Sequence, residues 1–208
     1  MVWLCGIIPV NSAGQVIAMA EKKIDRRTQK TRKALCEALS ELLTEKELRK
    51  VTVQEIADKA DVNRVTFYKH YLDVYDLYKK IEQQVLVEMG LLMLQLEELP
   101  SDKFFSHLID YIDDNHSVFR LIFSPNSPGM LKSKFNKLIE GVFRQIQAEK
   151  QSADIKDIRL QYQNCYRSQG CLAVIERWVQ NNFSETKSLI IEILSGLDFN
   201  TEKYIMAK

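Results

Sequence analysis

The chain has 208 residues, of which 46% are hydrophobic, so it can bury a sizeable core, and its seven glycines and four prolines argue for a mostly helical protein. Its net charge of +1 does not by itself indicate a partner. The four cysteines form no C-x-x-C pair, which removes the usual signal of a zinc site or a disulfide framework and fits a reducing cytoplasm.

Residues 1–20 carry no charged side chain. Their apolar run from Cys5 to Val10 is too short to span a bilayer, and the positively charged start of a signal peptide is missing. We therefore expect residues 1–20 to be a disordered extension or the product of an upstream start. No other segment is a transmembrane candidate, so no membrane association is expected.

The first predicted helix runs from about residue 25 to residue 45 and follows a basic segment. Residues 21–80 hold 15 lysines and arginines against 11 acidic residues, and the excess is densest at the start of this helix. A basic segment suits phosphate groups, although a solvated charge run would be the better explanation if it stood alone. The buried face of the helix is expected to hold Leu35, Ala38, Leu39, Leu42 and Leu43.

The next segment predicts two short helices joined by a tight turn, and its residues 52–71 read TVQEIADKADVNRVTFYKHY. Thr52 and Glu55 fit a capping box, in which each side chain bonds a free backbone N–H of the other residue. Behind this cap, apolar residues recur at helical spacing. They are Val53, Ile56, Ala57 and Ala60.

The second short helix has polar groups on its outer face. Asn63 is a favourable N-cap, and Val62 and Phe67 are placed to form a hydrophobic staple that fixes the entry angle. This leaves hydrogen-bond donors and one small apolar side chain facing outward, which is the chemistry of a recognition helix in the DNA major groove. The outward residues are Arg64, Val65, Thr66, Tyr68 and Lys69.

The remainder of the chain also predicts helices. Asp73 is expected to cap a long helix that Pro100 ends, and Ser184 to cap the last helix. The clearest loop is Ser124–Gly129. No run alternates with period two for long enough to make a sheet, so the expected fold is all-α, with a helix-turn-helix domain at 21–72 and a larger helical domain at 73–208. Its helices are expected at 74–98, 101–115, 116–123, 130–150, 154–181 and 185–197.

The sequence RRTQKTRKAL followed by TVQEIADKADVNRVTFYKHY resembles the DNA-binding domain of TetR-type bacterial transcriptional regulators, over roughly residues 25–80. The strongest match is the T-x-Y-x-H-aromatic run at Thr66, Tyr68, His70 and Tyr71. A weaker resemblance to the C-terminal half of one subgroup rests on a Y-I-x-x-N pattern and later aromatic positions. They are Tyr111 to Asn115, Phe119, Leu121, and Trp178-Val179.

The resemblance implies which side chains contact a double-stranded DNA operator. Gln54 and Arg64 would read base edges, and Val65 would touch a thymine methyl group. Phosphate contacts are implied for Arg27, Thr28, Thr52, Thr66, Tyr68, Lys69 and His70. Each has a structural alternative: Thr52 caps a helix in any case, and Tyr68 and His70 could serve packing and hydrogen bonding. Phe67 and Tyr71 are expected in the core.

The chain departs from the family pattern at three positions. Asp61 stands where the turn usually has glycine, and aspartate tolerates a left-handed backbone better than most residues. Leu72 replaces a proline or a small residue. Val74 stands where many relatives have a phosphate-binding lysine, which lowers the expected affinity for DNA, because Lys79 and Lys80 lie further along the helix.

In relatives, the C-terminal half binds a small molecule and forms a homodimer through its last two long helices. The residues that could line an aromatic pocket are Phe104, His107, Tyr111, Phe119, Phe123, Phe143, Tyr162, Tyr166 and Gln169. The dimer interface would use Leu172, Ile175, Trp178, Val179, Leu189, Ile190, Ile193, Leu194 and Leu197. Residues at such spacing could equally belong to the core of one protomer.

Three functional hypotheses follow. The first is a ligand-responsive repressor that binds a near-palindromic operator as a homodimer, with an unidentified effector. The second is an activator or co-regulator of the same fold that acts through a protein partner. The third is an all-α enzyme, which we do not favour, because the sequence has none of the usual catalytic motifs and no cofactor motif.

Overall fold

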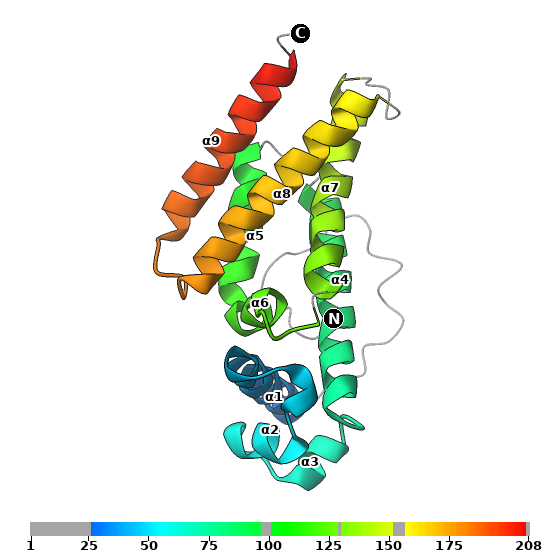
Figure 1. Cartoon of the computed structure of the whole chain (residues 1–208), viewed down its shortest axis with the longest axis vertical. Helices are drawn as coiled ribbons and strands as arrows, with labels where there is room; N and C mark the ends of the chain where they lie inside the picture. Colours follow the sequence, from blue (N-terminus) through cyan, green and yellow to red (C-terminus); the bar gives the residue numbers. More distant parts are fainter. Residues whose placement is uncertain (1–25, 97–100, 129, 152–156, 207–208) are drawn as a thin grey trace.

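Figure 1 shows the computed structural model of the chain, which describes residues 26–96, 101–128, 130–151 and 157–206. Within these ranges every regular element is helical, which confirms the all-α prediction. None of the described helices is long and apolar enough to cross a membrane. Residues 1–20, Pro100 and Gly129, on which some predictions rested, lie outside the described ranges.

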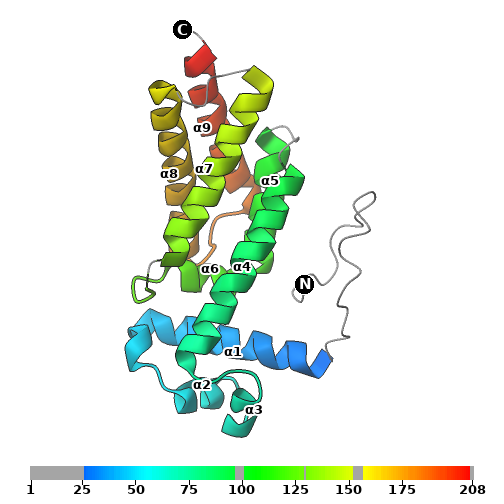
Figure 2. The ribbon, with the colours of Figure 1, turned by 90° about the vertical axis from the view of Figure 1, so that its right-hand side faces the viewer.

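The N-terminal part is a small bundle at one end of the molecule (Figures 1 and 2). It consists of α1 (Arg26–Glu45), a 3-10 turn (Leu48–Lys50), α2 (Val53–Lys59) and α3 (Arg64–Tyr68). All five apolar residues that were predicted on the inner face of α1 are buried. An ion pair between Lys59 Nζ and Glu41 Oε2, 2.9 Å apart, joins α2 to α1.

The C-terminal part is a bundle of longer helices. They are α4 (Val74–Leu96), α5 (Ser101–Asp114), α6 (His116–Phe123), α7 (Met130–Gln151), α8 (Ile158–Gln180) and α9 (Lys187–Met206). Helix α4 begins beside α3 and runs up into the bundle, so it belongs to both parts (Figure 2). Helix α7 packs against α4 and α8, and α5 packs against α9, while α6 lies across α1.

Helix α8 begins at Ile158, because the Asp157 carboxylate accepts the Arg159 N–H at 2.8 Å and caps the helix there. The predicted start at residue 154 lies outside the described residues. Helix α9 begins at Lys187 and continues to Met206, past the predicted end at Leu197. Its cap is Thr186, whose hydroxyl accepts the Leu189 N–H at 3.3 Å, so the assignment of Ser184 was wrong.

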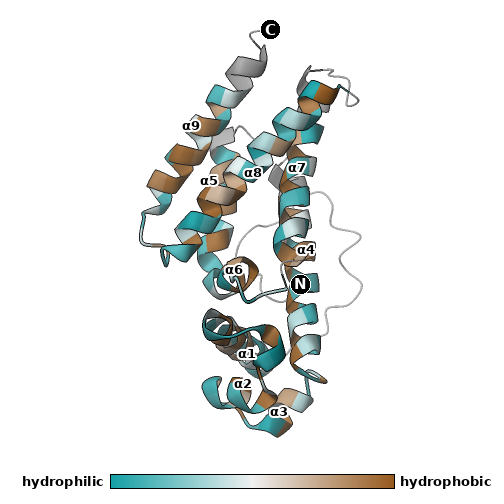
Figure 3. Ribbon diagram, viewed as in Figure 1, coloured by the Kyte–Doolittle hydropathy of each residue, from teal (hydrophilic) through white to brown (hydrophobic). Residues whose placement is uncertain are grey.

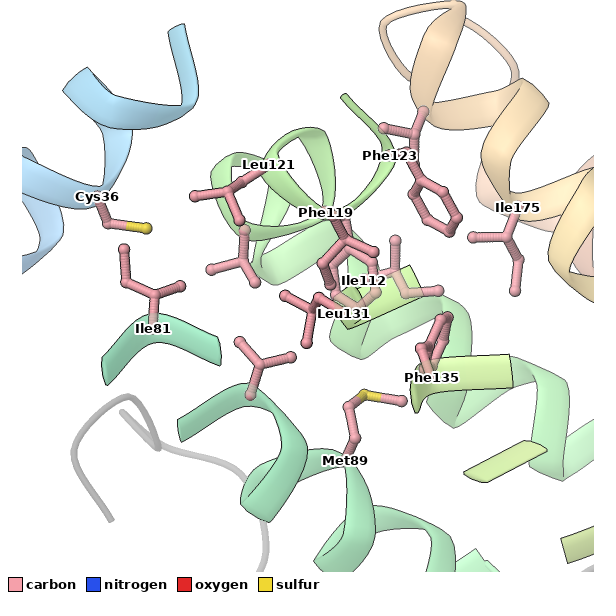
Figure 4. Close-up of a cluster of buried hydrophobic side chains, with 14 of the residues drawn as sticks. Cys36, Ile81, Met89, Ile112, Phe119, Leu121, Phe123, Leu131, Phe135 and Ile175 are labelled. Carbon is pink, nitrogen blue, oxygen red and sulfur yellow. The ribbon is translucent and has the colours of Figure 1, made fainter. Parts of the chain in front are cut away.

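The core is centred on α6. Figure 4 shows Phe119, Leu121 and Phe123 of α6 meeting side chains of α1, α4, α5, α7 and α8. Each large apolar side chain buried in this way contributes roughly 1.5–3 kcal/mol through its removal from water. Hydrophobic residues therefore concentrate along the inner sides of the helices, although α9 is apolar along much of its length (Figure 3).

The Y-I-x-x-N pattern has a structural role. The Tyr111 hydroxyl donates to Glu88 Oε2 at 2.8 Å and thus ties α5 to α4. Asn115 Nδ2 donates to the Tyr111 carbonyl at 2.8 Å, close to the end of α5. Burial raises the pKa of the Glu88 carboxyl, and the hydrogen bond from Tyr111 partly opposes this effect.

Candidate nucleic-acid interface

The start of α2 is fixed by the predicted capping box. The Glu55 N–H donates to Thr52 Oγ1 at 3.3 Å, and the Thr52 N–H donates to Glu55 Oε2 at 2.9 Å. Lys46 also bonds the Glu55 carboxylate, and this bond and those from Thr52 lower the pKa of Glu55 to about 2. The stabilisation that the ionised Glu55 carboxylate gives to the folded state is therefore complete above the ordinary glutamate pKa of about 4.3. It is lost as pH falls through about 2.

Thr52→Ala is expected to lower the free energy of unfolding by about 0.5–2 kcal/mol, because the Glu55 N–H loses its acceptor at the start of α2. Urea unfolding of the variant measures this loss. Thr44→Ala is the matched control, since Thr44 is an exposed threonine in the last turn of α1 that caps no helix start. Equal stabilities of the two variants would contradict the capping role.

The turn between α2 and α3 forms as predicted. Asp61 has a backbone φ of 52°, in the left-handed region that glycine usually occupies. The Asn63 side chain accepts the Val65 N–H at 2.8 Å, which caps α3. Phe67 is fully buried, and Val62 packs against the same core. These contacts fix the direction in which α3 leaves the bundle.

The outer face of α3 presents the residues that were predicted to read DNA. Arg64, Val65, Tyr68 and Lys69 are exposed, whereas Thr66 is half-buried. The Arg64 guanidinium lies 6.0 Å from the centre of the Tyr68 ring, and its Nη2 atom is 3.5 Å from the Tyr68 hydroxyl. The two side chains therefore form one polar and aromatic surface on α3.

Gln54 is exposed on the neighbouring α2, where its amide donates to Asp58 Oδ1. Arg27 is exposed and Thr28 is half-buried near the start of α1. Thr52 is exposed as well as being a cap. Helices α1, α2 and α3 lie at the same end of the molecule, so the predicted contact residues gather there (Figure 2).

His70 is half-buried, and burial is the main reason that its pKa is lowered. The positive charges of Arg32, Lys69 and Lys80 lower this pKa further. Without DNA, the neutral form of the His70 ring is therefore favoured. A phosphate beside the ring would act in the opposite direction, because a negative charge favours its protonated form.

Sequence reasoning missed the role of Lys80. Its ammonium group donates to the His70 carbonyl at 3.0 Å and to Asp76 Oδ2 at 2.9 Å. Asp76 also accepts the Leu72 N–H at 2.9 Å, and Asp73 accepts the Asp76 N–H at 2.7 Å. Lys80 thus ties α4 to the chain that follows α3. The i, i+4 spacing of Asp76 and Lys80 was the signal available in the sequence.

The nine predicted pocket residues differ in how far the protomer covers them. Phe104, Phe119, Phe123 and Phe143 are buried in the core, and Tyr111 is half-buried. The other four residues are exposed: His107, Tyr162, Tyr166 and Gln169. The side chains of these four therefore lie at the surface of the protomer, and the pocket assignment of the nine residues stays a prediction.

The predicted dimer residues fall into two groups. Six of them belong to the core of the protomer, where neighbouring helices already cover them: Leu172, Ile175, Trp178, Val179, Ile190 and Leu194. In the protomer these six therefore have the core role that the sequence also allowed. Leu189, Ile193 and Leu197 remain 43%, 38% and 56% exposed and follow one another at i, i+4 and i+8 along α9. On α8, Tyr162 and Tyr166 are 73% and 71% exposed.

Comparison with known families supports the interpretation of both parts. The model for bacterial regulatory proteins of the tetR family matches residues 35–80. A model for a transcriptional regulator C-terminal region matches residues 101–197. A Bacillus subtilis (strain 168) protein named as the uncharacterized HTH-type transcriptional regulator YxbF is 37% identical over 70 residues. That match covers 33% of this chain and only 18% of the relative.

Solved structures of regulators share the fold. The dihydroxyacetone kinase operon activator DhaS is 18% identical, with a TM-score of 0.52 over 80% of this chain and 95% of that one. NalD of Pseudomonas aeruginosa, the secondary repressor of the MexAB-OprM multidrug efflux pump, is 17% identical, with a TM-score of 0.55 over 83% and 97%. The matches at both ends of the chain, with this fold, lead to one conclusion. The protein is a transcriptional regulator of the TetR family.

Proposed function

We propose that the protein is a sequence-specific DNA-binding regulator, a ligand-responsive repressor that binds a near-palindromic operator as a homodimer in the cytoplasm. The observation that carries this proposal is the exposure of Arg64, Val65, Tyr68 and Lys69 along α3 and just after it, with Gln54 exposed on the neighbouring α2. A guanidinium can bond a guanine edge bidentately, an amide can pair with adenine, and a valine can contact a thymine methyl group.

Phosphate contacts position such a module on the duplex before any base is read. Lys69 and Arg27 are exposed cations near the two ends of the helix-turn-helix part, and Thr52 and Tyr68 offer exposed hydroxyls. We assign these four residues, together with Thr28, Thr66 and His70, to phosphates. The capping box and the Asn63 cap support the assignment, because they hold α2 and α3 in fixed positions while Thr52, Tyr68 and Lys69 stay exposed.

A homodimer is supported by the apolar side chains left uncovered on the last two helices. Leu189, Ile193 and Leu197 form a stripe on α9, and Tyr162 and Tyr166 are exposed on α8. Uncovered apolar side chains at helical spacing suit a partner helix. A two-fold dimer also suits a near-palindromic site, whose two half-sites lie about 34–36 Å apart, one turn of DNA, and each take one recognition helix.

Effector control requires that a ligand bind one conformation more tightly than the DNA-bound one. Helix α4 is the proposed lever, because Lys80 ties its first turns to the end of α3, while the Glu88–Tyr111 hydrogen bond ties its middle to α5. The aromatic residues beside α5 and α6 would then form the wall against which an effector binds. A screen for compounds that release the protein from its operator would identify the chemical class of the effector.

A second candidate is an activator or co-regulator that acts through a protein partner. Leu72 and Tyr75, which are 80% and 56% exposed near the start of α4, favour it, because large apolar side chains at a surface suit a protein contact. One similar structure is an activator and another is a repressor, so the shared fold does not set the sign of regulation.

The test of the proposed function is a selection of genomic or random DNA by the purified protein, repeated at two salt concentrations. A near-palindrome whose binding weakens with salt is the expected result, because phosphate contacts release counterions. Recovery of no sequence above the non-specific background would reject independent operator binding. A search for the protein partner of a co-regulator would then follow.

Arg64→Ala is expected to cost about 1–3 kcal/mol of binding free energy on the selected site and to blur the preference at one base position. The measurement is a binding titration on the operator and on its single-base variants. The control is Gln83→Ala, an exposed change on α4 far from the recognition helix in sequence. If affinity and base preference both stay as in the wild type, Arg64 does not read a base.

Lys69→Ala is expected to weaken binding to all DNA sequences about equally, because a phosphate contact carries no sequence information. The slope of log affinity against log salt should fall by about one. Titrations at four salt concentrations on the operator and on unrelated DNA measure both effects. A loss confined to the operator would show instead that Lys69 contacts a base.

A further inference from the structure

The turn between α6 and α7 is stiffened by its sequence. Residues 124–128 read Ser-Pro-Asn-Ser-Pro, and we name them the 124–128 turn. The Ser127 N–H donates to the Ser124 carbonyl at 3.1 Å, which closes a β-turn with Pro125 at its second position. Proline fixes φ at that position, so this turn has few alternative conformations. The Asn126 N–H also donates to Ser124 Oγ at 3.2 Å.

The 124–128 turn bonds the end of α1. Ser124 Oγ donates to the Leu43 carbonyl at 2.6 Å, and Asn126 Nδ2 donates to the same oxygen at 3.0 Å. Leu43 lies in the last turn of α1, where helix carbonyls lack an intrahelical donor. The turn therefore supplies, from 81 and 83 residues away in the sequence, the hydrogen bonds that this helix end requires.

The same turn bonds two further elements of the DNA-binding part. The Leu48 N–H donates to the Asn126 carbonyl at 3.4 Å, which reaches the 3-10 turn ahead of α2. The hydroxyls of Ser127 and Tyr78 lie 2.8 Å apart, which reaches α4. The side chains in these bonds are at least partly buried, so water competes weakly for them. One rigid turn thus holds α1, the 3-10 turn and α4 at once.

We propose that the 124–128 turn is a bracket that fixes the orientation of the helix-turn-helix part on the C-terminal half, and thereby sets the half-site spacing that the dimer accepts. Ser124, Asn126 and Tyr78 are its positioning residues. This inference rests on the proposed function, since spacing has meaning only for a dimer on a two-part operator.

The effect of the 124–128 turn on half-site spacing follows from the geometry of the dimer. In a two-fold dimer joined through α8 and α9, each α3 is carried at the far end of its protomer (Figure 1). A small rotation at the junction between the two parts therefore becomes a large displacement of α3. Because the half-sites of an operator lie a fixed number of base pairs apart, a loose junction would let the dimer accept several spacings.

The test compares wild type with the double variant Ser124→Ala/Asn126→Ala and the single variant Tyr78→Phe. Ser133→Ala is the control, since Ser133 is an exposed serine on the neighbouring α7. Each protein selects from a library in which the selected half-sites are kept and their spacing varies by one or two base pairs. The bracket predicts one preferred spacing for the wild type and the control. In the double variant the preference should fall by roughly tenfold, because both hydrogen bonds to the Leu43 carbonyl and the one that Ser124 Oγ accepts from the Asn126 N–H are lost.

Two results would overturn the bracket: a double variant with the same spacing preference as the wild type, or one that loses affinity equally at every spacing. Circular dichroism first establishes that the variants are folded. Hydrogen exchange of the Leu48 amide in the absence of DNA is a second readout, and it should become faster in the double variant. If wild type selects no operator, the proposed function fails, and unchanged exchange at Leu48 would separately reject the bracket.

Discussion

Replacing Asp198 with alanine is expected to lower the free energy of unfolding by about 3–5 kcal/mol. Asp198 of α9 accepts two hydrogen bonds from Arg167 of α8, from Nε at 2.8 Å and from Nη2 at 3.0 Å. The two side chains are only 3% and 4% exposed, and the guanidinium lies 4.3 Å from the centre of the Phe143 ring of α7. The alanine variant would leave a buried cation without its carboxylate.

Two further variants sharpen this prediction. Arg167→Met combined with Asp198→Leu should cost much less than Asp198→Ala, because apolar side chains replace both charges. Lys187→Ala removes an exposed ion pair to Asp110 and should cost about 0–1 kcal/mol. Urea unfolding at one fixed protein concentration measures all three, since dimer stability depends on concentration. A loss for Asp198→Ala no larger than for Lys187→Ala would contradict the role of the buried pair.

The helix-turn-helix part could be predicted in detail because its signals are local. Thr52 and Glu55 are three residues apart, and Asn63 caps the helix that follows it directly. Asp61 adopts the left-handed backbone that its place in the turn requires. Each feature depends on a few consecutive residues, so the one-dimensional pattern contains the whole physical reason.

The Arg167–Asp198 pair could not be predicted in the same way. The two residues are 31 positions apart, and charged side chains inside helical patterns are usually on the surface. A signal did exist: Arg167, Cys171 and Ile175 follow one another at i, i+4 and i+8, so the cation lies within an apolar stripe. Such a position indicates a buried charge, but its partner becomes known only when α8 and α9 are packed together.

The start of α9 was misplaced for a tertiary reason. Asn182 and Phe183 have φ values of 54° and 57°, so the chain makes a wide turn after α8. The Phe183 ring stacks on His116 with their centres 3.7 Å apart and meets the Trp178 ring edge-on. Because of this packing, α9 begins only after Thr186, which caps it. Ser184 was an equally good cap by residue type, and only the long-range contact decides between them.

The aromatic residues of the C-terminal half show the same limit. Phe119 and Tyr166 both recur at helical spacing, yet Phe119 is fully buried while Tyr166 is exposed. Spacing places residues on one face of a helix but does not say what covers that face. The sequence therefore predicted the helices, whereas the division of their apolar residues between the core of the protomer and its surface depends on how the helices pack.

Ile193→Glu is expected to raise the dissociation constant of the proposed dimer by at least about a hundredfold, because like charges brought together across an interface cost several kcal/mol. Ile193 is the middle residue of the exposed stripe on α9, between Leu189 and Leu197. The fold of the protomer should be retained, since this side chain is not part of the buried core. Analytical ultracentrifugation across a concentration series measures the change.

The same variant distinguishes the contribution of the dimer to operator binding from that of the recognition helix. Operator binding should weaken strongly, because a monomer holds only one half-site, whereas weak binding to unrelated DNA should persist through the phosphate contacts. Ser133→Glu places an equal charge on the exposed face of α7 and should leave both the dimer and operator binding unchanged. If Ile193→Glu stays dimeric, the stripe on α9 is not the interface, and the exposed tyrosines of α8 become the next face to test.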